Sequence, residues 1–95
     1  MKIIADTHTH TIASTHAYAT ITEMTAEAAK LGLYAFAVTD HGIDMPGAPQ
    51  LWYFHNLCAV PSTFMGVRVI KGAEANIAEF DGSLDLPEYT LAQLG

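Results

Sequence analysis

The sequence predicts an α/β fold with parallel strands, and three observations support this prediction. Apolar, β-prone runs alternate with helical segments, which is the pattern of a parallel sheet or a barrel. The central run, residues 33–38, lacks polar alternation, as expected of a strand buried on both faces. Histidine or acidic residues follow each predicted strand, where the functional groups of such folds gather.

The first strand and the first helix are predicted within the first 32 residues. Residues 2–5 form a β-prone run that stops at the polar segment 6–10. Thr22 can cap the helix that follows, and Gly32 is a signal that ends it. Between them, apolar residues recur at helical spacing, at Met24, Ala28 and Leu31.

The rest of the chain predicts two more strands and two shorter helices. Residues 33–38 form the second strand, residues 50–59 a short helix after a Pro/Gly-rich loop, and residues 67–73 the third strand. An Asp-Gly pair inside residues 77–86 predicts a hairpin turn. We expect another helix to begin at Pro87.

The composition limits the class of protein. Hydrophobic residues make up 51% of the chain, too many for a disordered tail, while the apolar runs are too short to span a bilayer. The net charge of −6 argues against a nucleic-acid partner. Cys58 is the only cysteine, which excludes an intrachain disulfide and a thiolate zinc cluster. We expect Cys58 to be buried, and the protein to be cytoplasmic without membrane contact.

The polar residues that follow the three predicted strands form a candidate metal site. His8 and His10 lie two positions apart, so both side chains leave the strand end on one face and can chelate a metal. His41 follows the second strand, and Glu74 follows the third. Because neighbouring parallel strands end at the same edge, we expect the four side chains to converge.

Other roles for these residues stay open at this stage. The H-x-H pair can be two surface histidines, and His41 can be a turn residue. Glu74 can pair with Arg68 or Lys71 instead of a metal, since a buried carboxylate needs some partner.

Residues around this set are candidates for supporting roles. Asp40 precedes His41 and is expected to assist catalysis by orienting it, although it can also be a simple cap. His16 lies in a loop, where spacing alone gives it no role, and His55 is expected to pack or to face solvent. The residues that can shape a substrate pocket are Ser14, Thr15, Tyr18 and the loop 42–46.

Several motifs resemble the polymerase-and-histidinol-phosphatase (PHP) superfamily. They are D-T-H-T-H at residues 6–10, T-D-H-G at 39–42 and G-A-E-A-N at 72–76. Longer segments are similar to its single-domain bacterial branch, the YcdX-like phosphatases: A-S-T-H-A-Y at 13–18, T-D-H-G-I-D-M-P-G-A-P at 39–49 and E-A-N-I-A-E-F-D-G at 74–82. The resemblance covers nearly the whole chain.

The resemblance implies a distorted, TIM-like β/α barrel that binds up to three divalent metal ions, most often zinc and otherwise manganese or iron. By this resemblance, His8, His10 and Glu74 would hold one ion, and Glu74 would bridge to a second. His16 and His41 would hold the third. His16 thereby gains a role that spacing did not give it, and Glu74 is expected to be catalytic.

The resemblance also implies a larger domain. The family completes its metal centre with ligands from later strands, and a β/α barrel takes about 250 residues. We therefore expect residues 1–95 to be the amino-terminal portion of one PHP domain, incomplete at its carboxyl end. Alone, this portion is expected to be inactive and to self-associate through unpaired strand edges.

The expected reaction is hydrolysis of a small phosphate monoester by a metal-activated water. One rival is C–N bond hydrolysis by an amidohydrolase-type barrel, which also begins with H-x-H after its first strand. Glu74 and the A-S-T-H-A-Y segment favour the phosphatase. The other rival is a non-catalytic metal-binding or structural PHP module, of the kind found within polymerases.

Overall fold

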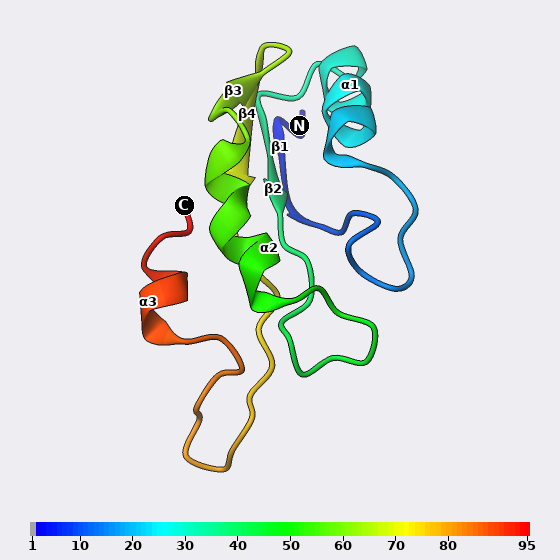
Figure 1. The fold of residues 1–95 in the computed structure, drawn as a ribbon. Helices are drawn as coiled ribbons and strands as arrows, with labels where there is room; N and C mark the ends of the chain where they lie inside the picture. Colours follow the sequence, from blue (N-terminus) through cyan, green and yellow to red (C-terminus); the bar gives the residue numbers. More distant parts are fainter. Residues whose placement is uncertain (1) are drawn as a thin grey trace.

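The computed structural model describes residues 2–95 and shows an open sheet with helices packed against it (Figure 1). Its elements in chain order are β1 (Ala5–Thr9), α1 (Ile21–Lys30), β2 (Ala35–Val38), α2 (Leu51–Asn56), the 3-10 helix η1 (Leu57–Ala59), β3 (Thr63–Phe64), β4 (Val67–Lys71) and α3 (Glu88–Leu91). The predicted α/β fold with parallel strands is confirmed. The short strand β3 is an addition that the sequence did not predict.

The sheet has the strand order β1-β2-β4-β3. β1, β2 and β4 run parallel, while β3 pairs antiparallel with β4. β2 lies between β1 and β4, and all four of its residues are buried, as its apolar sequence predicted. The carboxyl ends of the three parallel strands therefore lie along one edge of the sheet.

The first strand lies further along the chain than expected. It covers Ala5–Thr9 instead of residues 2–5, and Thr9 pairs with Val38 after an irregularity in register. The β-branched Thr7 and Thr9 favour extended backbone, so the polar segment continues the strand. His8 consequently lies within β1, and His10 follows it directly.

The cap of α1 is also different from the prediction. Thr20, not Thr22, is the N-cap, and it forms a capping box with Glu23. The Thr20 hydroxyl accepts a hydrogen bond from Glu23 N at 3.2 Å, and the Glu23 carboxylate accepts one from Thr20 N at 3.0 Å. This reciprocal pair satisfies two backbone donors, whereas Thr22 offers no such partner.

Two apolar clusters form the core. Ala28 of α1 packs with buried residues of β2 and β4, namely Phe36, Val38, Val67 and Val69. Phe54 and Leu57 pack with Leu86 in a second cluster, which Ala73 and Ala75 join as partly buried residues. Because Phe54 and Leu57 occupy the buried face of α2 and η1, Cys58 points outward and is exposed, so its predicted burial is wrong.

The segment 77–86 forms less regular structure than a hairpin. One antiparallel bridge joins Ile77 to Leu84, and Gly82 adopts a positive φ of 88° in the predicted turn. Phe80 at the tip is fully exposed. The helix expected after Pro87 is present as α3, with Pro87 as its N-cap.

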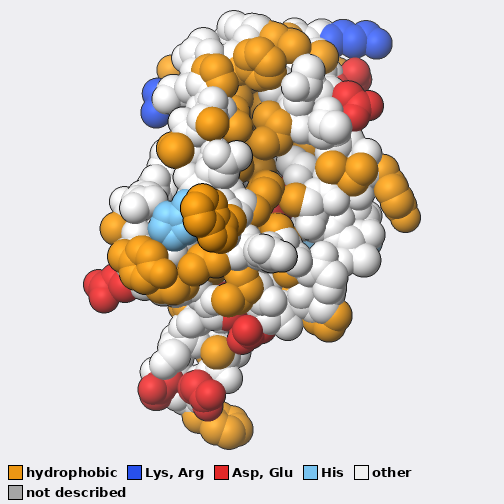
Figure 2. Space-filling view, viewed as in Figure 1, with side chains coloured by type: hydrophobic (Ala, Val, Ile, Leu, Met, Phe, Trp, Pro, Cys, Tyr) orange, Lys and Arg blue, Asp and Glu red, His pale blue; other side chains and the backbone are white. Residues whose placement is uncertain are grey.

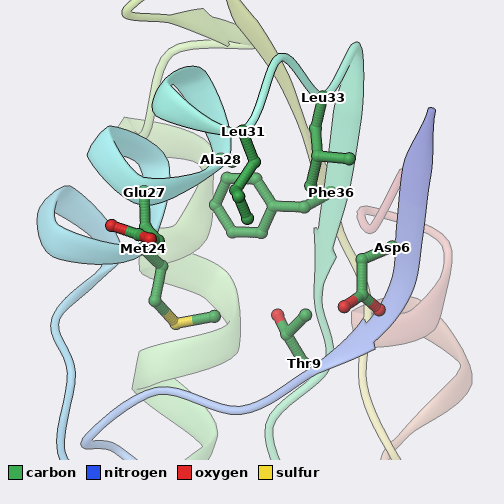
Figure 3. Close-up of a pocket in the computed structure, with 8 residues that line it drawn as sticks. All are labelled: Asp6, Thr9, Met24, Glu27, Ala28, Leu31, Leu33 and Phe36. Atoms are coloured by element: carbon green, nitrogen blue, oxygen red, sulfur yellow. The ribbon is translucent and has the colours of Figure 1, made fainter. Parts of the chain in front are cut away.

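The surface of the described residues has an apolar face and a small groove. Hydrophobic side chains gather over the face that carries α2 and α3 (Figure 2), and Trp52 and Tyr89 are among the exposed ones. A pocket of about 180 Å³ lies between α1 and the first two strands, with Phe36 and Met24 among its lining residues (Figure 3). Within residues 2–95, no helix has the length and apolar character needed to cross a membrane.

Candidate metal centre

Backbone pairing beyond the strand ends places Glu74 beside His41. The two residues form a parallel bridge that continues the β2–β4 pairing after both strands have ended. Glu74 N donates to Asp40 O, and Gly42 N donates to Glu74 O, both at 2.9 Å. The position of Glu74 opposite His41 is therefore set by main-chain hydrogen bonds rather than by its side chain.

His8, His10 and Glu74 form the tightest group of potential ligands. The two Nε2 atoms lie 3.1 Å apart, and Glu74 Oε2 lies 3.2 Å from His8 Nε2 and 3.1 Å from His10 Nε2. The three atoms thus form a nearly equilateral triangle. The ion pairs described for Glu74 are with histidines, so the alternative pairing with Arg68 or Lys71 is not found among residues 2–95.

His41 joins this triangle to His16. Its Nδ1 lies 3.3 Å from Glu74 Oε2, and its Nε2 lies 3.2 Å from Nε2 of His16. Its ring also stacks on His10, with centroids 4.5 Å apart. The structure therefore brings together all five side chains that the sequence analysis singled out as metal ligands. Their role as ligands stays a prediction.

The surroundings lower the pKa of two members of the group, His10 and Glu74. Burial lowers the pKa of His10, and the neighbouring charge of His41 lowers it further. For Glu74, partial burial raises the pKa, but the hydrogen bond with His8 and the histidine charges outweigh it, so the net shift is downward. Neutral imidazole and ionised carboxylate are the forms that coordinate a metal.

The arrangement fits a divalent ion with nitrogen and oxygen ligands. Two nitrogens bound to one tetrahedral zinc at about 2.05 Å lie about 3.3 Å apart, close to the separations seen here. Imidazole with carboxylate suits zinc, manganese or iron. The separations of 3.1–3.2 Å between the three ligand atoms match those of ligands that share one ion.

Asp40 lies fully buried beside this group, where four donors meet its carboxylate. Thr11 donates through its N–H and its hydroxyl, both at 2.7 Å, and Ser14 Oγ donates at 2.8 Å. The fourth donor is the hydroxyl of Tyr53. The connection of Asp40 to His41 runs through Ser14, whose Oγ accepts from His41 N at 3.2 Å.

The loops around the site contain the residues that were expected to shape a substrate pocket. Thr15 Oγ1 donates to Pro46 O at 3.1 Å, which ties the loop of His16 to the loop after His41. Tyr18, another residue expected to shape the pocket, has a side chain that is 82% exposed. Tyr53 was missed, because its place in an apolar helix resembled core packing. His55 packs as expected, stacking on Tyr89.

Asp85 is a second buried carboxylate that the sequence analysis missed. It accepts hydrogen bonds from Asn76 N at 2.8 Å, Asn76 Nδ2 at 2.7 Å and Asp44 N at 3.0 Å. It therefore ties the segment after Glu74 to the loop after His41. An aspartate flanked by two leucines is a signal that could have indicated burial.

The chain is similar to known proteins over nearly its whole length. The PHP domain family model matches residues 6–94. A protein of Acetivibrio thermocellus named a probable phosphatase is 54% identical over 94 residues, and one of Thermoanaerobacter sp. strain X514 with the same description is 55% identical. Another, from Photobacterium profundum, is 49% identical. Each alignment covers 99% of this chain, which spans 38–39% of the length of these relatives.

Proposed function

This chain belongs to the PHP domain family, and on that premise we propose that its histidine–glutamate group holds divalent metal ions for hydrolysis of a phosphate monoester. The observation that supports the proposal most strongly is the triangle of His8, His10 and Glu74, with ligand atoms 3.1–3.2 Å apart. The relatives named probable phosphatases support the phosphoester class of substrate.

In this proposal His8, His10 and Glu74 hold one ion. Glu74, whose carboxylate also faces His41, would contribute to a second ion. His16 and His41, whose Nε2 atoms face each other, would hold a third. Zinc suits these donors best, and manganese or iron are the alternatives. Bound divalent ions supply positive charge and the acidity that makes water a nucleophile at neutral pH.

The charge of the chain agrees with such a role for metals. With four Lys and Arg against ten Asp and Glu, the chain offers little positive charge of its own to a phosphate. A small phosphorylated substrate therefore depends on the ions for its electrostatic attraction. A cavity of about 360 Å³ lies beside the group, lined by Thr7, His8, Thr39, Ala73 and Glu74.

The two rivals make different predictions in one assay. An amidohydrolase-type enzyme would cleave C–N bonds and leave phosphate esters intact, and a non-catalytic module would bind metal without turnover. The names of the relatives favour the phosphatase. A cytoplasmic location, expected from the sequence, belongs to the same proposal and is tested by fractionating cells that express the tagged protein.

The test uses the full-length protein, purified with and without chelator, with metal content and hydrolysis of p-nitrophenyl phosphate measured on the same samples. We expect chelation to abolish turnover, and Glu74→Gln to lower both metal content and rate by at least tenfold. Glu79→Gln is the matched control, since Glu79 is an exposed glutamate outside the group. Undiminished turnover by metal-free protein would refute the proposal.

A further inference from the structure

We infer that Ser14 and Tyr53 are positioning residues that act through the buried Asp40 carboxylate to hold His16 and His41 together. Neither residue lies among the proposed ligands. The inference rests on the proposed function, because it assigns these residues to the metal held by His16 and His41 and not to the triangle of His8, His10 and Glu74.

The first support is the burial and saturation of Asp40. A carboxylate with no solvent exposure must gain its stabilisation from hydrogen bonds, and here three of the four donors are side-chain hydroxyls. These hydroxyls come from the loop after β1 and from α2. Asp40 itself directly precedes His41. One charge thus joins three separate segments of the chain next to a proposed ligand.

The second support is the geometry at Ser14, which is also buried. Its hydroxyl donates to Asp40 Oδ1 at 2.8 Å and accepts from the backbone N–H of His41 at 3.2 Å. Ser14 N donates to Thr11 O at 2.9 Å, so the loop turns at this point. His16 follows two residues later, and its Nε2 meets that of His41. Ser14 therefore links the backbone positions of both histidines.

The third support is Tyr53, which extends from α2 to the far oxygen of Asp40. Its hydroxyl donates to Oδ2, the same oxygen that accepts from Thr11 Oγ1. Burial raises the pKa of Tyr53, and the hydrogen bond to Asp40 raises it further, so the phenol keeps the proton that it donates. Tyr53 also packs against the apolar cluster of Phe54, Leu57 and Leu86, so its ring is partly buried.

The hydrogen bonds of Asp40 do not involve the side chains of the triangle. His8 lies in β1, which pairs with β2, His10 directly follows that strand, and Glu74 is placed by main-chain hydrogen bonds. The bond from Glu74 N ends on the backbone oxygen of Asp40, so it persists when hydroxyl donors are removed. The metal positions therefore fall into two classes, one held by His16 and His41 and one held by His8, His10 and Glu74. Loss of the Ser14 or Tyr53 hydroxyl should weaken metal binding in the first class and leave the second unchanged.

The experiment is a titration with Co²⁺ and Zn²⁺ of the full-length protein and of the variants Tyr53→Phe and Ser14→Ala. Visible absorption of bound Co²⁺ reports the geometry of each position, and equilibrium dialysis gives the affinity for Zn²⁺. His16→Ala identifies which class of ions depends on His16. We expect both hydroxyl variants to weaken that class by about tenfold or more and to alter its Co²⁺ bands, with the other class unchanged.

Tyr34→Phe is the matched control, because Tyr34 is 69% exposed and its loss of one hydroxyl should change neither class. Tyr53→Phe and Ser14→Ala each remove one hydroxyl, from two different segments of the chain, so either variant tests the inference where the other fails to fold. Equal weakening of both classes, or no weakening of either, would overturn the inference while leaving the proposed function intact. If His16→Ala binds the same ions as the wild type, with the same Co²⁺ bands and Zn²⁺ affinities, the ligand assignment of the proposed function is overturned as well.

Discussion

Asp40 and Asp85 are two buried carboxylates close to His41 in the fold: Asp40 directly precedes it, and Asp85 accepts a hydrogen bond from Asp44 N. The two use different donors. Asp40 accepts one backbone N–H and three hydroxyls. Asp85 accepts two backbone N–H groups and one amide from Asn76. The contacts of Asp40 can therefore be removed one side chain at a time, whereas most of those of Asp85 cannot.

The two carboxylates thus illustrate two kinds of support for a site, one mainly from main-chain donors and one mainly from side-chain donors. Around Asp85 two of the three donors belong to the main chain, so apart from Asn76 a substitution disrupts the support by changing Asp85 itself or by filling its space. Gly42 illustrates the second route, because a Cβ there would lie 2.6 Å from Asp85 Cγ and closer still to both carboxylate oxygens. Around Asp40 the support lies in Thr11, Ser14 and Tyr53, whose substitution should tune the site while the fold persists.

The largest expected effect is that of Gly42→Ala. The added methyl group overlaps a buried carboxylate and must displace it from its three donors, so we expect a loss of about 3 kcal/mol or more in the free energy of unfolding. Urea denaturation of the full-length protein measures this loss. Gly82→Ala is a useful comparison, since nothing lies within 4 Å of a Cβ there and only its positive φ adds strain. A Gly42→Ala variant as stable as wild type would contradict the packing around Asp85.

A smaller effect is expected for Asp85→Asn, at about 2 kcal/mol of unfolding free energy. The neutral amide keeps one acceptor oxygen but presents an NH₂ group to donors that then lack a partner. The metal class that depends on His16 should be retained, because Asp85 makes no contact with the Asp40 donors described here. Selective loss of that metal class in Asp85→Asn would show that Asp85, like Asp40, supports the metal position of His16 and His41.

Thr20→Ala should cost about 1 kcal/mol of unfolding free energy, because it removes the N-cap of α1 and breaks the capping box. Its value is as a reference, since it destabilises the fold without involving either carboxylate. Metal affinities measured beside the urea midpoint should not change. A shift in either metal class would show that global stability alone affects the ligands.

The smallest effect is a pH dependence assigned to Asp85. Burial raises the pKa of this carboxyl, but hydrogen bonds from Asn76 and Asp44 outweigh it and hold the pKa below its ordinary value. Its stabilisation is therefore complete above the unfolded pKa of about 3.9 and is lost as the pH falls through the lower folded value. In metal-free protein, the stability difference between wild type and Asp85→Asn should shrink below about pH 4. If the stability difference between wild type and Asp85→Asn stays constant below that pH, the pH dependence does not arise from Asp85.

The sequence predicted those features that depend on local pattern. The apolar run of β2, the parallel order of β1, β2 and β4, and the meeting of His8, His10, His41 and Glu74 all follow from periodicity and strand ends. The end of β1 was misplaced because β-branched threonines in a polar run also favour extended backbone. The cap of α1 was misplaced because Thr20-x-x-Glu23 was not recognised as a capping box.

The supports of the site could not be predicted in the same way. Tyr53 and Asp40 are 13 positions apart, and Asp85 and Asp44 are 41 apart, so only the folded chain shows that they meet. His16 was placed by resemblance and not by spacing, since a loop residue has no periodicity to fix its direction. Cys58 was misjudged because a six-residue helix with one buried face does not reveal from sequence alone which face that is.

The central claim is that His8, His10, His16, His41 and Glu74 together bind divalent metal ions. The most direct measurement is X-ray diffraction from crystals of the full-length protein grown with zinc, with data collected on both sides of the zinc absorption edge. We expect anomalous peaks within bonding distance of the His8, His10 and Glu74 ligand atoms and of the facing nitrogens of His16 and His41. Absence of anomalous density at these side chains, at saturating zinc, would contradict it.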